Sequence, residues 1–447
     1  MNQRLHGKGI KFIAVGRILP ILLLLFPSSV IASGDDSDRL SGVVKPTITV
    51  VRPYAASKAP VIEEFRVPTL NSAPSGLAID SKDRVWFTEM LGNSLAVFDP
   101  STNEFKEYRV PSTKGLPKTD WKYDPKKRET PKETINVYSV GNPGNVIVTK
   151  KDVIWFVMQL GNSVVRFDPI KEEFTEFLLP TPNALPYDLA EDSKGNIWFI
   201  EKNSAKFAYL DMKKKKVVEI ELEKGANLMG ITLDKKDNVW LSDAMNNYVG
   251  RYNPQTRKIK RYPMTVQNAQ PGAIKFDKEG RLWICQARTK QIGVFMPDMG
   301  LFSVADMPGY NAVPQSLSPA DDDKIWFVDI MMNRVGFFDT INLKWVIFSI
   351  PTIDSQPMDI GIDSKGDIWF TQSGRKANRI ARLVRSTVPA ELPEGAGIRD
   401  NNLPERNSLA GKSFSGSQRL ALFVVGGIVF LTVIFGILFI RRKRFKA

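Results

Sequence analysis

The sequence predicts an all-β fold, a β-propeller of seven blades. The prediction rests on a fixed repeat, on the strands within each repeat and on how the two ends of the repeat region match. Seven tryptophans mark the repeat, each preceded by an aliphatic residue: Trp86, Trp155, Trp198, Trp240, Trp283, Trp326 and Trp369. They lie 42 or 43 residues apart, except for a first interval of 69, which equals one period plus an insertion of 26. A period near 43 residues is typical of propellers and of stacked repeat units.

Each repeat contains four short strands. In the first one we expect strands over residues 76–80, 84–89, 94–98 and 105–110, separated by turns rich in Gly, Asp, Asn and Pro. The β-branched and aromatic runs lack a period of 3.6 residues, which argues against helical repeats. Four antiparallel strands make one propeller blade. We expect the Trp of each second strand to pack between neighbouring blades rather than to bind a ligand.

The two ends of the repeat region complete one another. The fourth strand of most units ends in an apolar residue followed by Pro, as in Val110-Pro111. After Trp369 only a third strand remains, over residues 379–384, while a matching fourth strand lies at 63–68. We therefore predict one propeller over residues 62–385, closed by its N-terminal strand, with an inserted loop at about 112–137. Such closure leaves no open sheet edge.

The termini predict a membrane protein. Residues 1–33 have a basic start, an apolar stretch at 18–26 and small residues after it, the layout of a signal peptide, although an uncleaved anchor is an alternative. Residues 420–440 are 21 uncharged residues, enough for a transmembrane helix, and the basic tail at 441–447 is expected in the cytoplasm. A cleavable sorting signal would look similar. Residues 34–61 form a lead-in, and 386–419 form a flexible stalk.

Composition limits the possible chemistry. The net charge is +14, but residues 1–33 contribute +4 and the C-terminal tail +5, beside the two apolar segments. This basicity therefore indicates membrane topology rather than nucleic-acid binding. One Cys excludes a disulfide framework and a Cys-cluster metal site. His6, in the leader, is the only His, so His-based acid–base chemistry is not available to the repeats.

Two segments resemble the repeat of the streptogramin lyase (virginiamycin B lyase) family. They are residues 74–89, which include Val-Trp86-Phe-Thr-Glu89, and residues 357–372, and the likeness extends over about 62–384. The resemblance implies a seven-bladed propeller, and lyases of this family open a cyclic depsipeptide by elimination with Mg²⁺ and a His at the start of certain first strands. The corresponding positions here are Ser75, Gly144, Tyr187, Met229, Gly272, Gln315 and Met358. Without a His there, we expect no lyase activity.

Repeat position also selects candidate site residues. The starts of the first strands should surround the mouth of the central channel, so we expect ligand binding by Ser75, Tyr187, Met229, Gln315 and Met358. Acids three residues after the Trp should lie on the same side of the ring: Glu89, Glu201, Asp243 and Asp329. Their oxygens could bind Ca²⁺ or Mg²⁺. The alternative is that each caps a turn or pairs with the neighbouring blade.

The predicted function is that of a binding module on the outer side of the cell membrane, anchored by one helix. Its partner would be an unknown protein or small molecule, with the inserted loop, which is basic and aromatic, as a second contact surface or a solvated excursion. One alternative is a divergent metal-dependent lyase or lactonase. Another is a structural surface protein that assembles laterally, because propellers host unrelated functions.

Overall fold

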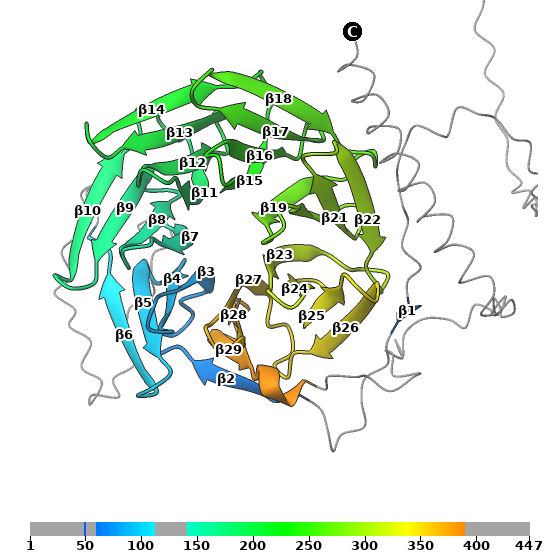
Figure 1. Cartoon of the computed structure of the whole chain (residues 1–447). Helices are drawn as coiled ribbons and strands as arrows, with labels where there is room; N and C mark the ends of the chain where they lie inside the picture. The colour runs from blue at the N-terminus through cyan, green and yellow to red at the C-terminus, as the bar shows by residue number, and fades with distance from the viewer. Residues whose placement is uncertain (1–48, 51–59, 112–140, 389–447) are drawn as a thin grey trace, which may run out of the picture.

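The computed structural model describes residues 49–50, 60–111 and 141–388, and its strands form seven sheets arranged in a ring (Figure 1). Blade 1 contains β3 (Pro74–Ile79), β4 (Val85–Glu89), β5 (Ser94–Asp99) and β6 (Glu104–Arg109). Blade 2 contains β7 (Pro143–Val148), β8 (Ile154–Met158), β9 (Ser163–Asp168) and β10 (Glu173–Leu178). Blade 3 contains β11 (Pro186–Glu191), β12 (Ile197–Glu201), β13 (Lys206–Asp211) and β14 (Lys216–Glu221).

The other four blades repeat this order. Blade 4 contains β15 (Leu228–Leu233), β16 (Val239–Asp243), β17 (Tyr248–Asn253) and β18 (Lys258–Pro263). Blade 5 contains β19 (Pro271–Phe276), β20 (Leu282–Gln286), β21 (Gln291–Met296) and β22 (Leu301–Asp306). Blade 6 contains β23 (Pro314–Pro319), β24 (Lys324–Asp329), β25 (Arg334–Asp339) and β26 (Lys344–Ser349). Blade 7 contains β27 (Pro357–Ile362), β28 (Ile368–Gln372), β29 (Arg379–Leu383) and β2 (Ile62–Arg66), and a 3-10 helix follows at Arg385–Thr387.

The ring closes as the sequence predicts. Strand β2 is the outermost strand of blade 7 and pairs antiparallel with β29, with Ile62 opposite Leu383 and Arg66 opposite Arg379 (Figure 1). The guanidinium of Arg382 also binds the Glu63 carboxylate at 2.5 Å. The first and last strands of the propeller are thereby joined by a continuous ladder of hydrogen bonds. The sequence did not predict β1 (Thr49–Val50), which pairs parallel with β26 at the outer edge of blade 6.

The repeated tryptophans fill the space between blades. Trp86, Trp240, Trp326 and Trp369 are completely buried. In five blades the indole N–H donates to the Asp that follows the first strand, as from Trp86 to Asp80 at 2.9 Å. In blade 6 Ala320 takes the place of this Asp, and the N–H of Trp326 has no hydrogen-bond partner. The prediction that these rings pack between blades is therefore confirmed.

Several predicted segments lie outside the described residues. They are the signal peptide (1–33), most of the lead-in (34–61), the insertion (112–137), the stalk from residue 389, the transmembrane segment (420–440) and the tail (441–447). Within the described ranges, no helix has the length and apolar character needed to cross a membrane. Cys285, on β20, is buried as expected, and burial raises the pKa of its thiol.

Candidate ligand-binding site at the mouth of the ring

The innermost strand of each blade runs beside the ring axis, and the first residues of these strands lie at one end of that axis, which we call the mouth (Figure 1). The predicted binding residues all occupy the second position of such a strand: Ser75, Tyr187, Met229, Gln315 and Met358. Ser75 is buried at 7% exposure, and the other four are half-buried. The fold thus places these five residues around the mouth. They present two thioethers, a phenol, an amide and a hydroxyl.

Tyr187 and Lys202 form a cation–π pair at the mouth. Lys202 directly follows β12, and its Nζ lies 4.3 Å from the centroid of the Tyr187 ring. Burial lowers the pKa of Lys202. Within the described part of the chain, Lys202 makes no ion pair. A half-buried ammonium group beside an aromatic ring favours a ligand that brings its own negative charge. Lys202 was not among the residues predicted from the sequence.

Two aspartates at the third position of the innermost strands join neighbouring blades. Asp188 accepts hydrogen bonds from Asn145 Nδ2 at 3.0 Å and from the backbone N–H of Ile231 at 3.1 Å. It thereby connects blades 2, 3 and 4. On the other side of the ring, Asp359 connects blades 6, 7 and 1 through the Ser316 hydroxyl and the Leu77 N–H, each at 2.8 Å.

These carboxylates also set the electrostatics of the channel. Burial raises the pKa of Asp188, although its hydrogen bonds oppose the shift. Burial first, and then the charges of Asp188 and Asp359, raise the pKa of Tyr187. The phenol of Tyr187 therefore lies within electrostatic range of blade 7 as well as of its own blade 3. It stays neutral and can donate a hydrogen bond. Asp188 and Asp359 were not predicted, although an Asp in the sequences Pro-Tyr-Asp and Pro-Met-Asp was the available signal.

The acids proposed as metal ligands are buried within separate blades. Glu89, Glu201, Asp243 and Asp329 have no exposed surface, and each ends the second strand of its blade. Asp243 accepts the backbone N–H groups of Asn227, Met245 and Asn246 at 3.0–3.1 Å. Asp329 forms an ion pair with Arg334 at 2.8 Å. For Asp243 and Asp329, the hydrogen bonds match the alternative in which these acids cap turns. Among the described residues, no three Asp, Glu, Cys or His side chains group as a metal ion would require.

The other two acids, Glu89 and Glu201, have raised pKa values. Burial, and then the neighbouring Glu107, raise the pKa of Glu89 well above its ordinary value. Burial raises the pKa of Glu201 to about 7, opposed by a hydrogen bond that the Ser204 hydroxyl donates at 2.7 Å. Gln286 and Gln372 occupy the same place in blades 5 and 7. A neutral side chain is therefore compatible with this position in the fold.

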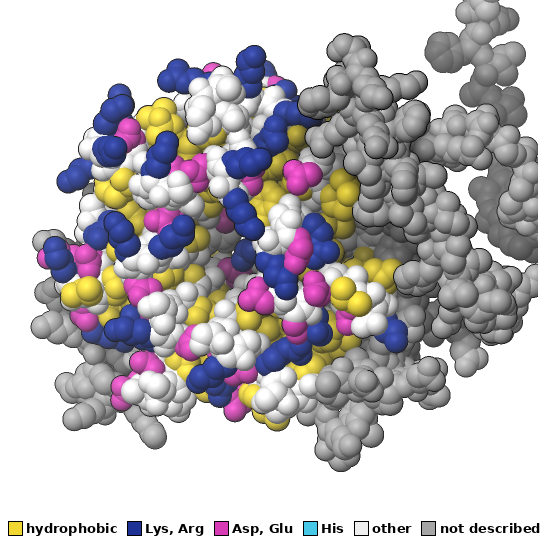
Figure 2. Space-filling model, in the orientation of Figure 1, with side chains coloured by type: hydrophobic (Ala, Val, Ile, Leu, Met, Phe, Trp, Pro, Cys, Tyr) yellow, Lys and Arg dark blue, Asp and Glu magenta, His cyan; other side chains and the backbone are white. Residues whose placement is uncertain are grey.

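The two faces of the ring differ in charge. The mouth face consists of the loops that enter the first strands and those that follow the second strands. It carries few charges and several exposed apolar side chains, among them Leu160, Met245, Tyr310, Met331 and Ile353, each more than 60% exposed. The opposite face carries loops such as Asp-Lys-Lys-Asp at 234–237 and three aspartates at 321–323. Figure 2 shows that charged side chains surround the ring on the face toward the viewer.

Comparison with known proteins agrees with this architecture. A sequence profile described as the Virginiamycin B lyase family matches residues 131–393. No curated protein sequence matches significantly. Among solved structures, the virginiamycin B lyase from Staphylococcus aureus superposes with a TM-score of 0.62 at 22% identity, over 72% of this chain and 98% of that one.

Two further solved structures extend the comparison. A streptogramin B lyase superposes with a TM-score of 0.62 at 26% identity, over 72% of this chain and 97% of that chain. The extracellular domain of a hybrid two-component system from B. thetaiotaomicron gives 0.54 at 16% identity, over 73% and 43% of the two chains, which shows the shared fold alone. The profile covers more than half of the sequence, so this chain belongs to the virginiamycin B lyase family.

Proposed function

We propose that this protein is a ligand-binding propeller on the outer side of the cell membrane. Its C-terminal apolar segment anchors it, and its ligand binds at the mouth. Support for the anchor comes from the sequence, because residues 420–440 are uncharged and a basic tail follows. Protease treatment of intact cells tests the topology. We expect digestion of the propeller and protection of the tail, and a protected propeller would contradict the proposal.

The ligand that suits this mouth is an amphipathic anion. Lys202 offers a positive charge without a competing acid among the described residues, and this is the observation on which the proposal rests. Met229 and Met358 offer adaptable apolar contacts. The neutral phenol of Tyr187 can stack on an apolar group or donate a hydrogen bond to an acidic one. A compound with an apolar body and one carboxylate or sulfonate would use all of these groups.

Elimination chemistry has little support in these residues. The reaction requires a base to remove a proton and a group to stabilise the negative charge that develops. His6 is the only His of the chain, and the four acids on the second strands are fully buried, with Asp243 and Asp329 engaged by backbone N–H groups. One solved structure with this fold is a catalytically inactive histidine-to-alanine variant of virginiamycin B lyase with quinupristin. We therefore propose binding without lyase activity.

The binding proposal can be tested with anilinonaphthalene sulfonate, a fluorescent amphipathic anion. We expect saturable binding to the purified protein, weakened about tenfold in Lys202→Ala because a charge-assisted contact contributes roughly 1.5–3 kcal/mol. Lys194→Ala is the matched control, since Lys194 is exposed on the β11–β12 loop at the opposite face. Equal affinities in Lys202→Ala and in the unchanged protein would contradict a site at the mouth.

The absence of lyase activity needs its own assay. Incubation of the protein with quinupristin and Mg²⁺, followed by mass spectrometry, distinguishes linearised from intact antibiotic. We expect intact antibiotic at every protein concentration. Mg²⁺-dependent linearisation by this chain would instead support the divergent lyase.

A further inference from the structure

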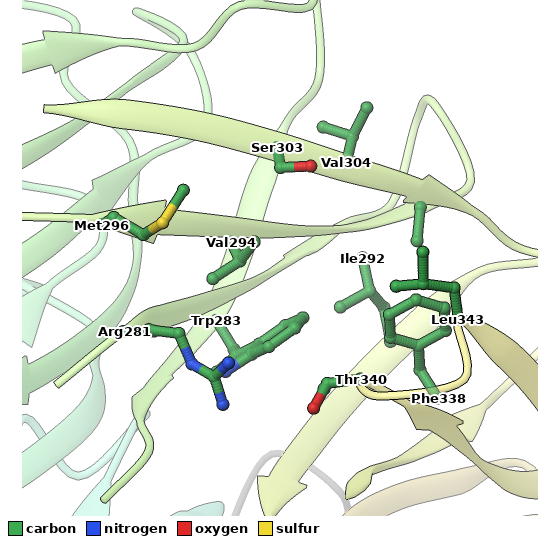
Figure 3. Close-up of a pocket in the computed structure, with 11 residues that line it drawn as sticks. Arg281, Trp283, Ile292, Val294, Met296, Ser303, Val304, Phe338, Thr340 and Leu343 are labelled. Carbon is green, nitrogen blue, oxygen red and sulfur yellow. The ribbon is translucent and has the colours of Figure 1, made fainter. Parts of the chain in front are cut away.

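A pocket of about 170 Å³ lies between blades 5 and 6, away from the mouth. Its walls are the face of blade 5 that carries Trp283 and Val294, and the end of the third strand of blade 6 with Phe338. Figure 3 shows Phe338 and Leu343 together on one side of Trp283. Val294 and Ser303 are half-buried and Leu343 is 39% exposed, so the pocket opens toward the rim of the ring.

The other blade junctions explain this space. At three of them, an aromatic ring of the fourth strand forms a triangle with the Trp of its own blade and an aromatic ring on the third strand of the next blade. The three sets are Trp86, Tyr108 and Phe167; Trp240, Tyr262 and Phe295; and Trp369, Phe65 and Phe98. The centroid of the fourth-strand ring is 5.6–6.1 Å from that of the Trp and 4.6–4.7 Å from that of the third-strand ring of the next blade.

The junction of blades 5 and 6 has the Trp and the third-strand ring but no ring on the fourth strand. The centroids of Trp283 and Phe338 are 6.4 Å apart, against 5.7–5.8 Å for the corresponding pairs of the three complete sets. In blade 5 the fourth-strand position of this ring is occupied by Ala305. Ala305 pairs with Ile292 just as Tyr108 pairs with Leu95 in blade 1. The neighbouring side chains of Val294 and Ser303 are small as well. The pocket is therefore the volume that an aromatic ring occupies elsewhere in the same protein.

We propose that this pocket binds the phenyl ring of a small neutral aromatic compound against Trp283 and Phe338, at the position of the missing fourth-strand ring. The volume matches a single ring, because a dry apolar cavity of about 150 Å³ can hold benzene. The lining favours a neutral ring, since the one charged lining residue, Arg281, already pairs with Asp277 at 2.6 Å. Stacking or edge-to-face contacts with the rings of Trp283 and Phe338 would strengthen binding beyond the burial of apolar surface.

Titration of the full-length protein with benzyl alcohol, followed by ligand-observed NMR, tests this assignment. We expect saturable binding that Ala305→Phe weakens at least tenfold, because the new ring fills the pocket as Tyr108 and Tyr262 do in their blades. Ala305→Leu is a second blocking variant, should the phenyl group prevent folding. Met299→Ala, exposed on the same blade, should bind like the unchanged protein.

A saturated analogue and a mouth variant separate the remaining explanations. Cyclohexylmethanol should bind at least fivefold more weakly than benzyl alcohol, because it lacks the stacking contribution. Lys202→Ala should leave benzyl alcohol binding unchanged, which distinguishes this site from the mouth. No binding to the unchanged protein, binding that survives both substitutions of Ala305, or equal affinity for the two alcohols would each overturn the proposal.

Discussion

The space between the blades and the mouth of the ring follow different rules. Between blades the same contacts recur, as in the indole-to-Asp hydrogen bond of five blades and the aromatic sets of three. At the mouth, the second residue of the innermost strand is Ser, Gly, Tyr, Met or Gln, depending on the blade. The repeated contacts between blades therefore specify the fold. The positions that vary from blade to blade at the mouth are free to specify a ligand.

The largest effect should come from breaking a repeated contact where the ring closes. Trp369→Ala removes a completely buried ring that packs against Phe65 and Phe98 from the start of the chain. We expect a loss of about 3–5 kcal/mol in the free energy of unfolding, measured by denaturant titration. Met299→Ala, at a 67% exposed site, should stay within about 0.5 kcal/mol. A loss below about 1 kcal/mol for Trp369→Ala would show that this junction carries little stability.

A smaller loss is expected for the bridges around the channel. Asp359→Ala leaves the Leu77 N–H and the Ser316 hydroxyl without their acceptor, so we expect a loss of about 2–3 kcal/mol. Asp188→Ala should have a similar effect, since it makes the corresponding contacts. Asp298→Ala, exposed in the β21–β22 loop, is the control. A change in Asp359→Ala no larger than in this control would refute the bridging role.

The buried Glu201 predicts a specific pH dependence. Its pKa is about 7 in the folded protein and ordinarily 4.5, so folding favours the protonated form. The contribution of Glu201 to stability is therefore greatest below pH 4.5 and is lost as pH rises through 7. From pH 5 to 8 the unchanged protein should lose about 2 kcal/mol more than Glu201→Gln, measured by urea unfolding. Identical pH profiles would show that Glu201 titrates normally.

Restoring a missing repeat contact should give the smallest effect, and a positive one. Ala320→Asp supplies the acceptor that the buried N–H of Trp326 lacks in blade 6. We expect a gain of about 1 kcal/mol, because the net contribution of one buried hydrogen bond is of that size. Thermal unfolding of the variant checks the sign. A decrease in stability would mean that the charge buried at residue 320 costs more than the bond contributes.

The repeat made most of the fold predictable from sequence. The period of the tryptophans, the turns and the unmatched strand at 63–68 are local features, and each blade contains nearly the same pattern. The observed strand ends differ from the predicted ones by one or two residues in blade 1, where Pro74–Ile79 was expected over 76–80. Such shifts arise because strand ends depend on pairing with a neighbouring strand as well as on local residues.

The site was less predictable, because its contacts join residues of different repeats. The bond from Asn145 to Asp188 spans 43 residues, and neither residue alone indicates it. Nor does the sequence tell which way a carboxylate at a strand end points, so Asp329 could be read as a metal ligand until its partner Arg334 is known. The pocket beside Ala305 could have been found by aligning the fourth strands, where a small residue replaces an aromatic one.

The place where an amphipathic anion binds decides whether the mouth is the ligand-binding site. Bromohexanoate has a carboxylate for Lys202, an alkyl chain for the methionines of the mouth, and no ring for the pocket between blades 5 and 6. Anomalous diffraction from crystals soaked in this compound would locate its bromine. We expect a bromine peak at the mouth, beside Tyr187 and Met229. Peaks confined to the charged face or the rim, with an empty mouth, would contradict it.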